Sequence, residues 1–185
     1  MPTHPRPPRA HGTLFHADVT RPRGDLLLPL AMLRDRHPDL YALHAAKYAG
    51  REQRLREPVT PLGCTWSDVV FLSPVDPAVL FDAVRVSGRR VRDVRVLTLD
   101  AADLDPGRCC VRLMRVRPGA MTAEPGTDDD HLPLTTATLR AVSEVTDRAL
   151  RRLRTLGPDD PVLPWGDVPH VLHRGPVPLR LFRWS

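Results

Sequence analysis

The chain has 185 residues, of which 42% are hydrophobic and 26% charged, and its formal net charge at pH 7 is +5. This length suits one domain with its own hydrophobic core, and the basic charge is compatible with nucleic acid or another polyanion as a partner. No stretch approaches the roughly 18 apolar residues of a membrane span, and the N-terminus lacks an apolar signal region, so we expect a cytoplasmic protein.

The first elements predicted along the chain are a tail and a strand. Residues 1–11 are rich in proline, arginine and histidine and predict a flexible tail, which leaves residues 12–185 as a single domain. Residues 13–19 alternate in polarity like a strand, with Leu14, His16 and Asp18 on one face.

Two helices are predicted next. The first covers residues 26–36 with Asp25 as its N-cap, and the His37–Pro38 step ends it. The second, capped by Asp39, covers residues 40–49 and stops at Gly50.

The rest of the chain alternates between short strands and helices. After a loop at 51–64, we predict strands at 68–73, 91–99 and 108–116, helices at 78–86 and 134–156, and extended segments at 161–164, 168–173 and 179–184. No glycine-rich phosphate loop, Gly-x-Ser-x-Gly or HExxH motif is present, which argues against a dinucleotide-binding Rossmann fold, a P-loop fold and common hydrolases. This order predicts a mixed α+β fold.

The cysteines give no sign of a metal site. Cys64 stands alone and Cys109 is followed directly by Cys110, so no ligand spacing suits zinc. We therefore expect no metal and a reducing compartment.

A basic segment precedes the strand at 68–73. It begins with Lys47, the only lysine of the chain, and continues with Arg51, Arg54 and Arg56. Cations beside a strand edge are a plausible way to hold a phosphate-bearing ligand, and Tyr48 offers an aromatic ring for stacking. A solvated basic surface and simple packing are the alternative interpretations.

Three segments in one order carry a family resemblance. They are Leu14-Phe-His-Ala-Asp-Val-Thr, the basic segment with Asp68-Val-Val-Phe-Leu-Ser-Pro-Val-Asp-Pro-Ala-Val-Leu, and Asp160-Pro-Val-Leu followed by Val168-Pro-His-Val-Leu. The chain resembles the DarT family of DNA ADP-ribosyltransferases. That family has a Y-H-I-T-H strand, a basic segment before a strand–turn–helix, and a late acidic residue before a V/I-P step. The three blocks cover about a third of the chain, and the central block matches best.

The resemblance implies a fold of two small packed β-sheets with surrounding helices and NAD as co-substrate. His16 would hold the nicotinamide end, and Arg51, or Arg54 next, would contact the pyrophosphate or the acceptor. Asp160 stands where the family has its catalytic glutamate, and Asp18 stands in place of the family's second histidine. Both are departures from the family pattern. With Lys47 and Tyr48, these residues are the predicted site.

The function expected from the resemblance is ADP-ribosyl transfer from NAD to a nucleobase of DNA, a small molecule or a protein. A carboxylate would stabilise the oxocarbenium-like ribose and accept a proton, and a guanidinium would clamp the phosphates. Two alternatives remain. One is an inactive relative that binds nucleic acid or a protein, and the other is an enzyme for a different nucleotide-like substrate. At single residues, His16 also fits a core histidine, and Asp160 also fits a turn.

Overall fold

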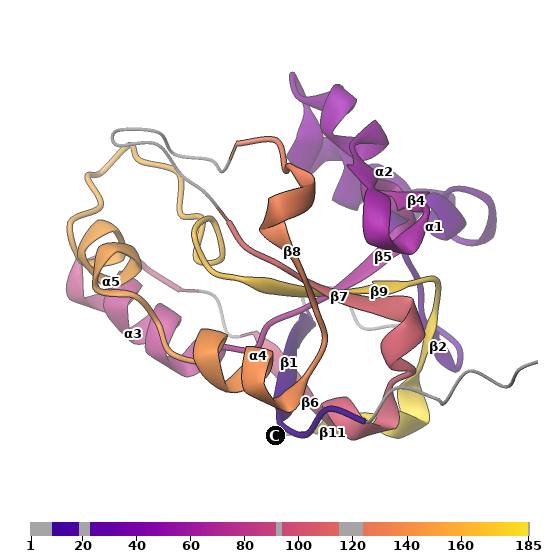
Figure 1. Cartoon of the computed structure of the whole chain (residues 1–185). Helices are drawn as coiled ribbons and strands as arrows, with labels where there is room; N and C mark the ends of the chain where they lie inside the picture. Colours follow the sequence, from indigo (N-terminus) through magenta and orange to yellow (C-terminus); the bar gives the residue numbers. More distant parts are fainter. Residues whose placement is uncertain (1–8, 19–22, 92–93, 115–123, 185) are drawn as a thin grey trace, which may run out of the picture.

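Two antiparallel sheets form the centre of the fold in a computed structural model that describes residues 9–18, 23–91, 94–114 and 124–184 (Figure 1). The first sheet has the order β1-β6-β11, with β1 (Thr13–Asp18), β6 (Arg95–Asp100) and β11 (Arg183–Trp184). The second has the order β5-β9-β7-β8, with β5 (Val69–Leu72), β9 (His170–Arg174), β7 (Cys109–Arg112) and β8 (His131–Pro133).

The two sheets share one hydrophobic core. Each contributes side chains that are at most 3% exposed: Leu14, Leu97 and Leu99 from the first sheet, and Val70, Leu72, Val111 and Val171 from the second. Burying each such side chain stabilises the fold by about 1.5–3 kcal/mol relative to leaving it in water. The sheets also meet through paired backbone bonds, from Phe15 N to Ser73 O (2.8 Å) and from Ser73 N to Phe15 O (2.7 Å). The expected α+β class is confirmed.

Two short strand pairs complete the β-structure. β2 (Leu26–Leu27) pairs with β10 (Val177–Pro178), and β3 (Pro58–Val59) pairs with β4 (Cys64–Thr65).

The helices lie around the sheets in two groups (Figure 1). α1 (Leu30–Arg36) and α2 (Pro38–Ala45) pack together near β5, and η1 (Ala46–Tyr48) continues α2 as a 3₁₀ turn. α3 (Pro77–Val86) packs against α5 (Asp147–Arg154) on the opposite side of the molecule, with α4 (Thr136–Val142) beside them. The remaining 3₁₀ turns are η2 (Glu52–Arg56), η3 (Thr60–Leu62), η4 (Trp66–Asp68), η5 (Ala101–Asp103), η6 (Pro106–Arg108), η7 (Asp128–Asp130) and η8 (Leu179–Leu181).

Where local chemistry decides, the predicted elements are confirmed. The helix predicted at 78–86 is α3, and Asp76 is its N-cap, accepting a hydrogen bond from Ala78 N at 2.9 Å. The His37–Pro38 step separates α1 from α2, because a residue before proline is disfavoured in helical conformation.

Two helix predictions were wrong. Leu26 and Leu27 are not helical, because they form β2 on β10, and α1 starts only at Leu30. The predicted helix over 134–156 is two helices, because the Thr146 side chain accepts from Ala149 N and starts α5. Asp39, predicted as a cap, lies inside the first turn of α2, whose N-cap is His37.

The end of the predicted tail is held by the domain. Ala10 is 2% exposed, Arg9 Nη1 donates to Ala102 O at 3.0 Å, and His11 N donates to Thr136 Oγ1 at 2.9 Å. Residues 1–8 of that tail lie outside the described residues. Across the ranges that the structure describes, no helix has the length and apolar character needed to cross a bilayer.

Candidate functional site

A cavity of about 320 Å³ lies between β1, β5 and the α1–α2 pair. Its walls are mainly apolar, with leucines from residues 26–33 facing Val69, Val70 and Phe71 of β5. α1 and α2 contain no buried residue, and their side chains Leu30, Leu33 and Leu40 line the cavity. A concave apolar site with a few polar groups is the usual form of a small-molecule site.

Every ionisable side chain that lines the cavity, within the described part of the chain, belongs to a basic residue or a tyrosine. They are His16, Arg23, His37, His44, Lys47, Tyr48 and His170. Arg23 is already paired with Asp39, at 2.6 Å from Nη2 to Oδ2. No aspartate or glutamate is among these lining residues, so the cavity favours a ligand with negative charge.

His16 is positioned by the sheet contact. β1 ends beside β5, and His16 Nδ1 lies 2.9 Å from the carbonyl oxygen of Phe71. Because a carbonyl only accepts, Nδ1 carries the proton in this contact. His16 is one of the residues that line the cavity.

His44 and Lys47 form a close basic pair at the end of α2. Lys47 Nζ lies 3.2 Å from His44 Nδ1. Burial lowers the pKa of His44 to about 4, helped by the charges of Lys47 and His16. Burial also lowers the pKa of Lys47. The ammonium donates to an imidazole that stays neutral at pH 7.

Tyr48 and Arg54 are joined through Trp66. Trp66 Nε1 donates to Tyr48 Oη at 3.0 Å, and the Arg54 guanidinium lies 4.6 Å from the centroid of the Trp66 ring. Burial raises the pKa of Tyr48, so its hydroxyl stays protonated at neutral pH. Tyr48 and Trp66 line the cavity, whereas Arg54 supports Trp66 and is not a lining residue.

Arg54 belongs to a buried ionic cluster next to the cavity. Its Nε lies 3.2 Å from Glu57, and Arg112, which is 1% exposed, lies 3.6 Å from Glu57 and 3.4 Å from Asp130. Arg54 Nη1 also donates to Glu124 O at 3.1 Å. The cluster therefore fixes Arg54 behind the Trp66 wall of the cavity.

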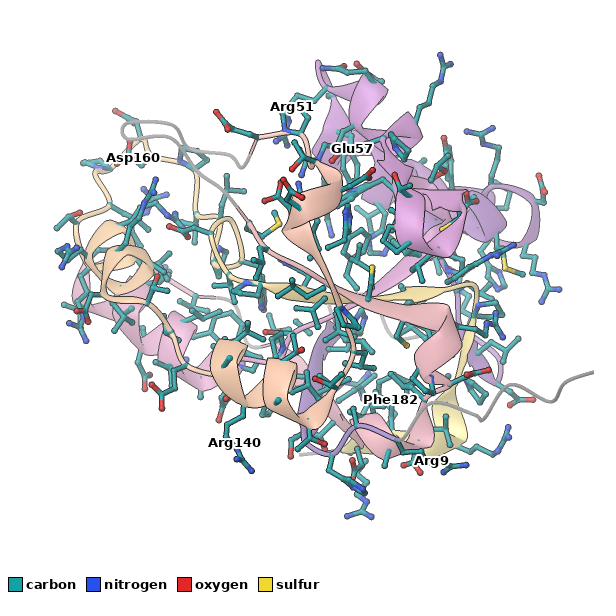
Figure 2. All side chains as sticks on the ribbon, in the orientation of Figure 1. Arg9, Arg51, Glu57, Arg140, Asp160 and Phe182 are labelled. Atoms are coloured by element: carbon teal, nitrogen blue, oxygen red, sulfur yellow. The ribbon has the colours of Figure 1, made fainter. Side chains whose placement is uncertain are left out.

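Like Arg54, the predicted site residues Arg51 and Asp160 do not line the cavity. Arg51 is exposed and donates from Nη2 to Lys47 O at 2.9 Å, so it is next to the cavity but not a lining residue. Asp160 is exposed in the turn after α5, where its Oδ2 accepts from Gly157 N at 2.7 Å. Figure 2 shows Arg51 and Asp160 well apart, on separate parts of the surface. Asp18 ends β1 opposite Arg95, and its side chain lies outside the described residues.

The turn contacts at Asp160 explain its position. Its carboxylate closes a three-residue loop, and its carbonyl oxygen, with those of Gly157 and Pro158, accepts from Arg89 Nη1. These contacts match the turn interpretation of the Gly-Pro-Asp-Asp-Pro sequence. Of the predicted site residues whose side chains the structure describes, only His16, Lys47 and Tyr48 line the cavity.

Sequence reasoning missed His37, His44 and His170 as cavity residues. A signal for the first two was present, because His37, Leu40, His44 and Lys47 follow one another at spacings of three and four residues. Such spacing places them on one helix face. His170 had no local signal, because β9 is brought to the cavity only by its pairing with β5.

Neither a metal-binding group nor a similarity to known proteins identifies the function of the cavity. Within the described residues, no group of three or more His, Cys, Asp or Glu side chains is arranged to hold a metal ion. No protein-family model, curated protein or solved structure matches the chain significantly.

Proposed function

We propose that this protein has an ADP-ribosyltransferase-like fold and binds NAD with its nicotinamide end in the cavity. The observation that supports this most directly is that His16, Lys47 and Tyr48, which the family resemblance and the basic segment single out, line one cavity. Its volume of about 320 Å³ is at the low end of the ~300–1,000 Å³ typical of ligand sites. It therefore suits one ring and sugar, not a whole dinucleotide.

The second half of the dinucleotide extends beyond the cavity in this proposal. Arg51 lies next to Lys47, because its Nη2 donates a hydrogen bond to Lys47 O. A guanidinium there is suitably placed to bind the outer phosphate or the acceptor.

Transfer of ADP-ribose needs more than binding. The oxocarbenium-like ribose is stabilised by a nearby carboxylate, and the described lining residues include none. Asp160, the predicted catalytic group, is engaged in its turn. This observation favours the alternative function, in which the domain binds the nucleotide, or a nucleic acid or protein partner, without turning NAD over.

Calorimetry with NAD tests the proposal. We expect NAD to bind, nicotinamide to compete, and His16→Ala to weaken binding at least tenfold, which corresponds to about 1.4 kcal/mol. Asp160→Asn is the matched control and should leave the affinity unchanged. If NAD produces no heat and no protection against thermal unfolding, the proposal is wrong.

Release of nicotinamide in the presence of DNA, RNA or cell extract separates the two functions. Turnover by the native protein would reject the binding-only alternative. Turnover that Asp160→Asn abolishes would restore Asp160 to a catalytic role, against its position in the structure.

A further inference from the structure

A second cavity, of about 440 Å³, lies among η5, η6, the end of β9 and η8. We propose that it is a binding site for a free amino acid with an apolar side chain. The proposal goes beyond nucleotide binding and does not depend on it. Among the described residues, this second cavity shares only Leu26 with the lining of the first.

Two carboxylates and two guanidiniums line the second cavity, as far as the structure describes the chain. Asp103 lies in η5 and Asp105 is the N-cap of η6. Arg108 lies in η6 and Arg180 in η8. None of the ion pairs between described residues involves any of these four groups. Because their charges sum to zero, the cavity suits a zwitterion, whose ammonium and carboxylate each find an opposite charge.

His173 supplies a buried polar group in the same cavity. It is 5% exposed and shares a face of β9 with the core residue Val171, because alternate residues of a strand point to the same side. Its Nδ1 lies 3.2 Å from Gly175 O, and because a carbonyl only accepts, Nδ1 carries the proton. Burial lowers the pKa of His173, so the ring is neutral at pH 7 and Nε2 is an acceptor. Nε2 bonds to no described residue.

The other lining residues of the second cavity are apolar. They are Leu26, Leu104, Pro176, Pro178 and Leu181. An apolar cavity of about 150 Å³ is large enough to hold benzene. The second cavity, at about 440 Å³, therefore has room for a side chain such as that of leucine or phenylalanine together with the ammonium and carboxylate.

These groups define how an amino acid binds in this proposal. Its carboxylate pairs with the Arg180 guanidinium, which has no hydrogen bond or ion pair within the described residues. Arg108 donates from Nη2 to Arg174 O at 2.7 Å, and its other N–H groups can donate to the same carboxylate. The ammonium donates to Asp103 and to His173 Nε2, and the side chain packs on the leucines and prolines.

Separately solvated surface charges are the alternative explanation of this cavity. That explanation accounts for Asp105, whose carboxylate caps η6 by accepting from Gly107 N at 3.0 Å. It gives no role to Asp103, whose carboxylate bonds to no described residue. It also leaves Nε2 of the buried His173 ring without a donor from the described part of the protein, although buried polar groups are normally hydrogen-bonded.

NMR titration with L-leucine tests the site directly. In ¹H–¹⁵N spectra, millimolar leucine should shift the amides of residues 103–108 and 173–181. Three probes each lack one recognised part of leucine. They are 4-methylpentanoate without the ammonium, leucinamide without the carboxylate, and glycine without the apolar side chain. Each should bind at least tenfold more weakly than leucine.

Matched variants identify the charged groups. Arg180→Gln and Asp103→Asn should each weaken leucine binding at least tenfold. The controls are exposed charges outside the lining residues, Arg183→Gln on β11 and Asp159→Asn after α5, and they should leave the affinity unchanged. Urea unfolding with an unchanged midpoint shows that the variants are folded.

The outcomes decide the proposal without reference to nucleotide binding. Absence of shifts with leucine and phenylalanine, or shifts confined to other residues, would overturn it. Equal binding of leucine and 4-methylpentanoate would overturn the recognition of a zwitterion. Binding that Arg180→Gln and Asp103→Asn leave intact would place the ligand elsewhere. NAD is titrated separately, so its failure to bind would affect the proposed function alone.

Discussion

Replacing Arg112 by methionine should strongly destabilise the protein. The Arg112 side chain is 1% exposed, and its two carboxylate partners, Asp130 and Glu57, are 2% and 10% exposed. Methionine fills most of the volume but leaves both carboxylates without this cation. Breaking a buried ion pair in this way costs about 3–5 kcal/mol.

The remaining contacts place the loss at the lower end of that range. Asp130 keeps hydrogen bonds from Thr127 N and Thr127 Oγ1, and Glu57 keeps Arg54 and Gly126 N. We therefore expect a loss of about 3 kcal/mol. For a chain of this length, that corresponds to a decrease in melting temperature of about 6–12 °C.

Urea unfolding followed by circular dichroism measures the change, with exposed Arg140→Met as the control. That control should change the free energy of unfolding by less than about 0.5 kcal/mol. The double variant Arg112→Met with Asp130→Asn should lose less than the sum of the two single variants, because the residues are coupled. A loss below about 1 kcal/mol for Arg112→Met would refute the importance of the cluster.

Two further predictions concern titration. Burial lowers the pKa of His170 to about 4, below the unfolded value of about 6.5. The contribution of His170 to stability should therefore be constant above about pH 7 and be lost between about pH 6.5 and 4, by up to about 3 kcal/mol. His170→Phe should flatten that slope in urea unfolding at pH 7.5 and 5, and an unchanged slope would contradict it. Burial likewise raises the pKa of Cys109 and Cys110 to about 12, so a thiol reagent at pH 8 should label only half-buried Cys64 until urea unfolds the protein. Equal labelling of all three thiols in the folded state would show that the strand cysteines are accessible.

Local chemistry in the sequence was sufficient for several elements. The N-cap Asp76, the break at Pro38 and the apolar strand Val69–Leu72 each depend on neighbours within a few residues. The same holds for the turn at Asp160, where a carboxylate accepts from an amide three residues earlier. Such short-range interactions are specified by residue types and spacing, so one sequence reveals them.

Long-range packing decided the rest. Leu26 and Leu27 suit a helix on their own, but pairing with Val177 and Pro178, about 150 residues later, makes them a strand. His170 reaches the cavity only because β9 pairs with β5, and Asp160 is kept away from it by the position of α5.

The sequence by itself determined an α+β chain with a strand histidine and a basic segment. Only the tertiary structure decided which of those charges share a cavity, and it grouped His16 and Lys47 with His44 while excluding Asp160. The physical reason is that a cavity is formed where separate elements meet. Its composition depends on sheet pairing and helix packing, which no local pattern encodes.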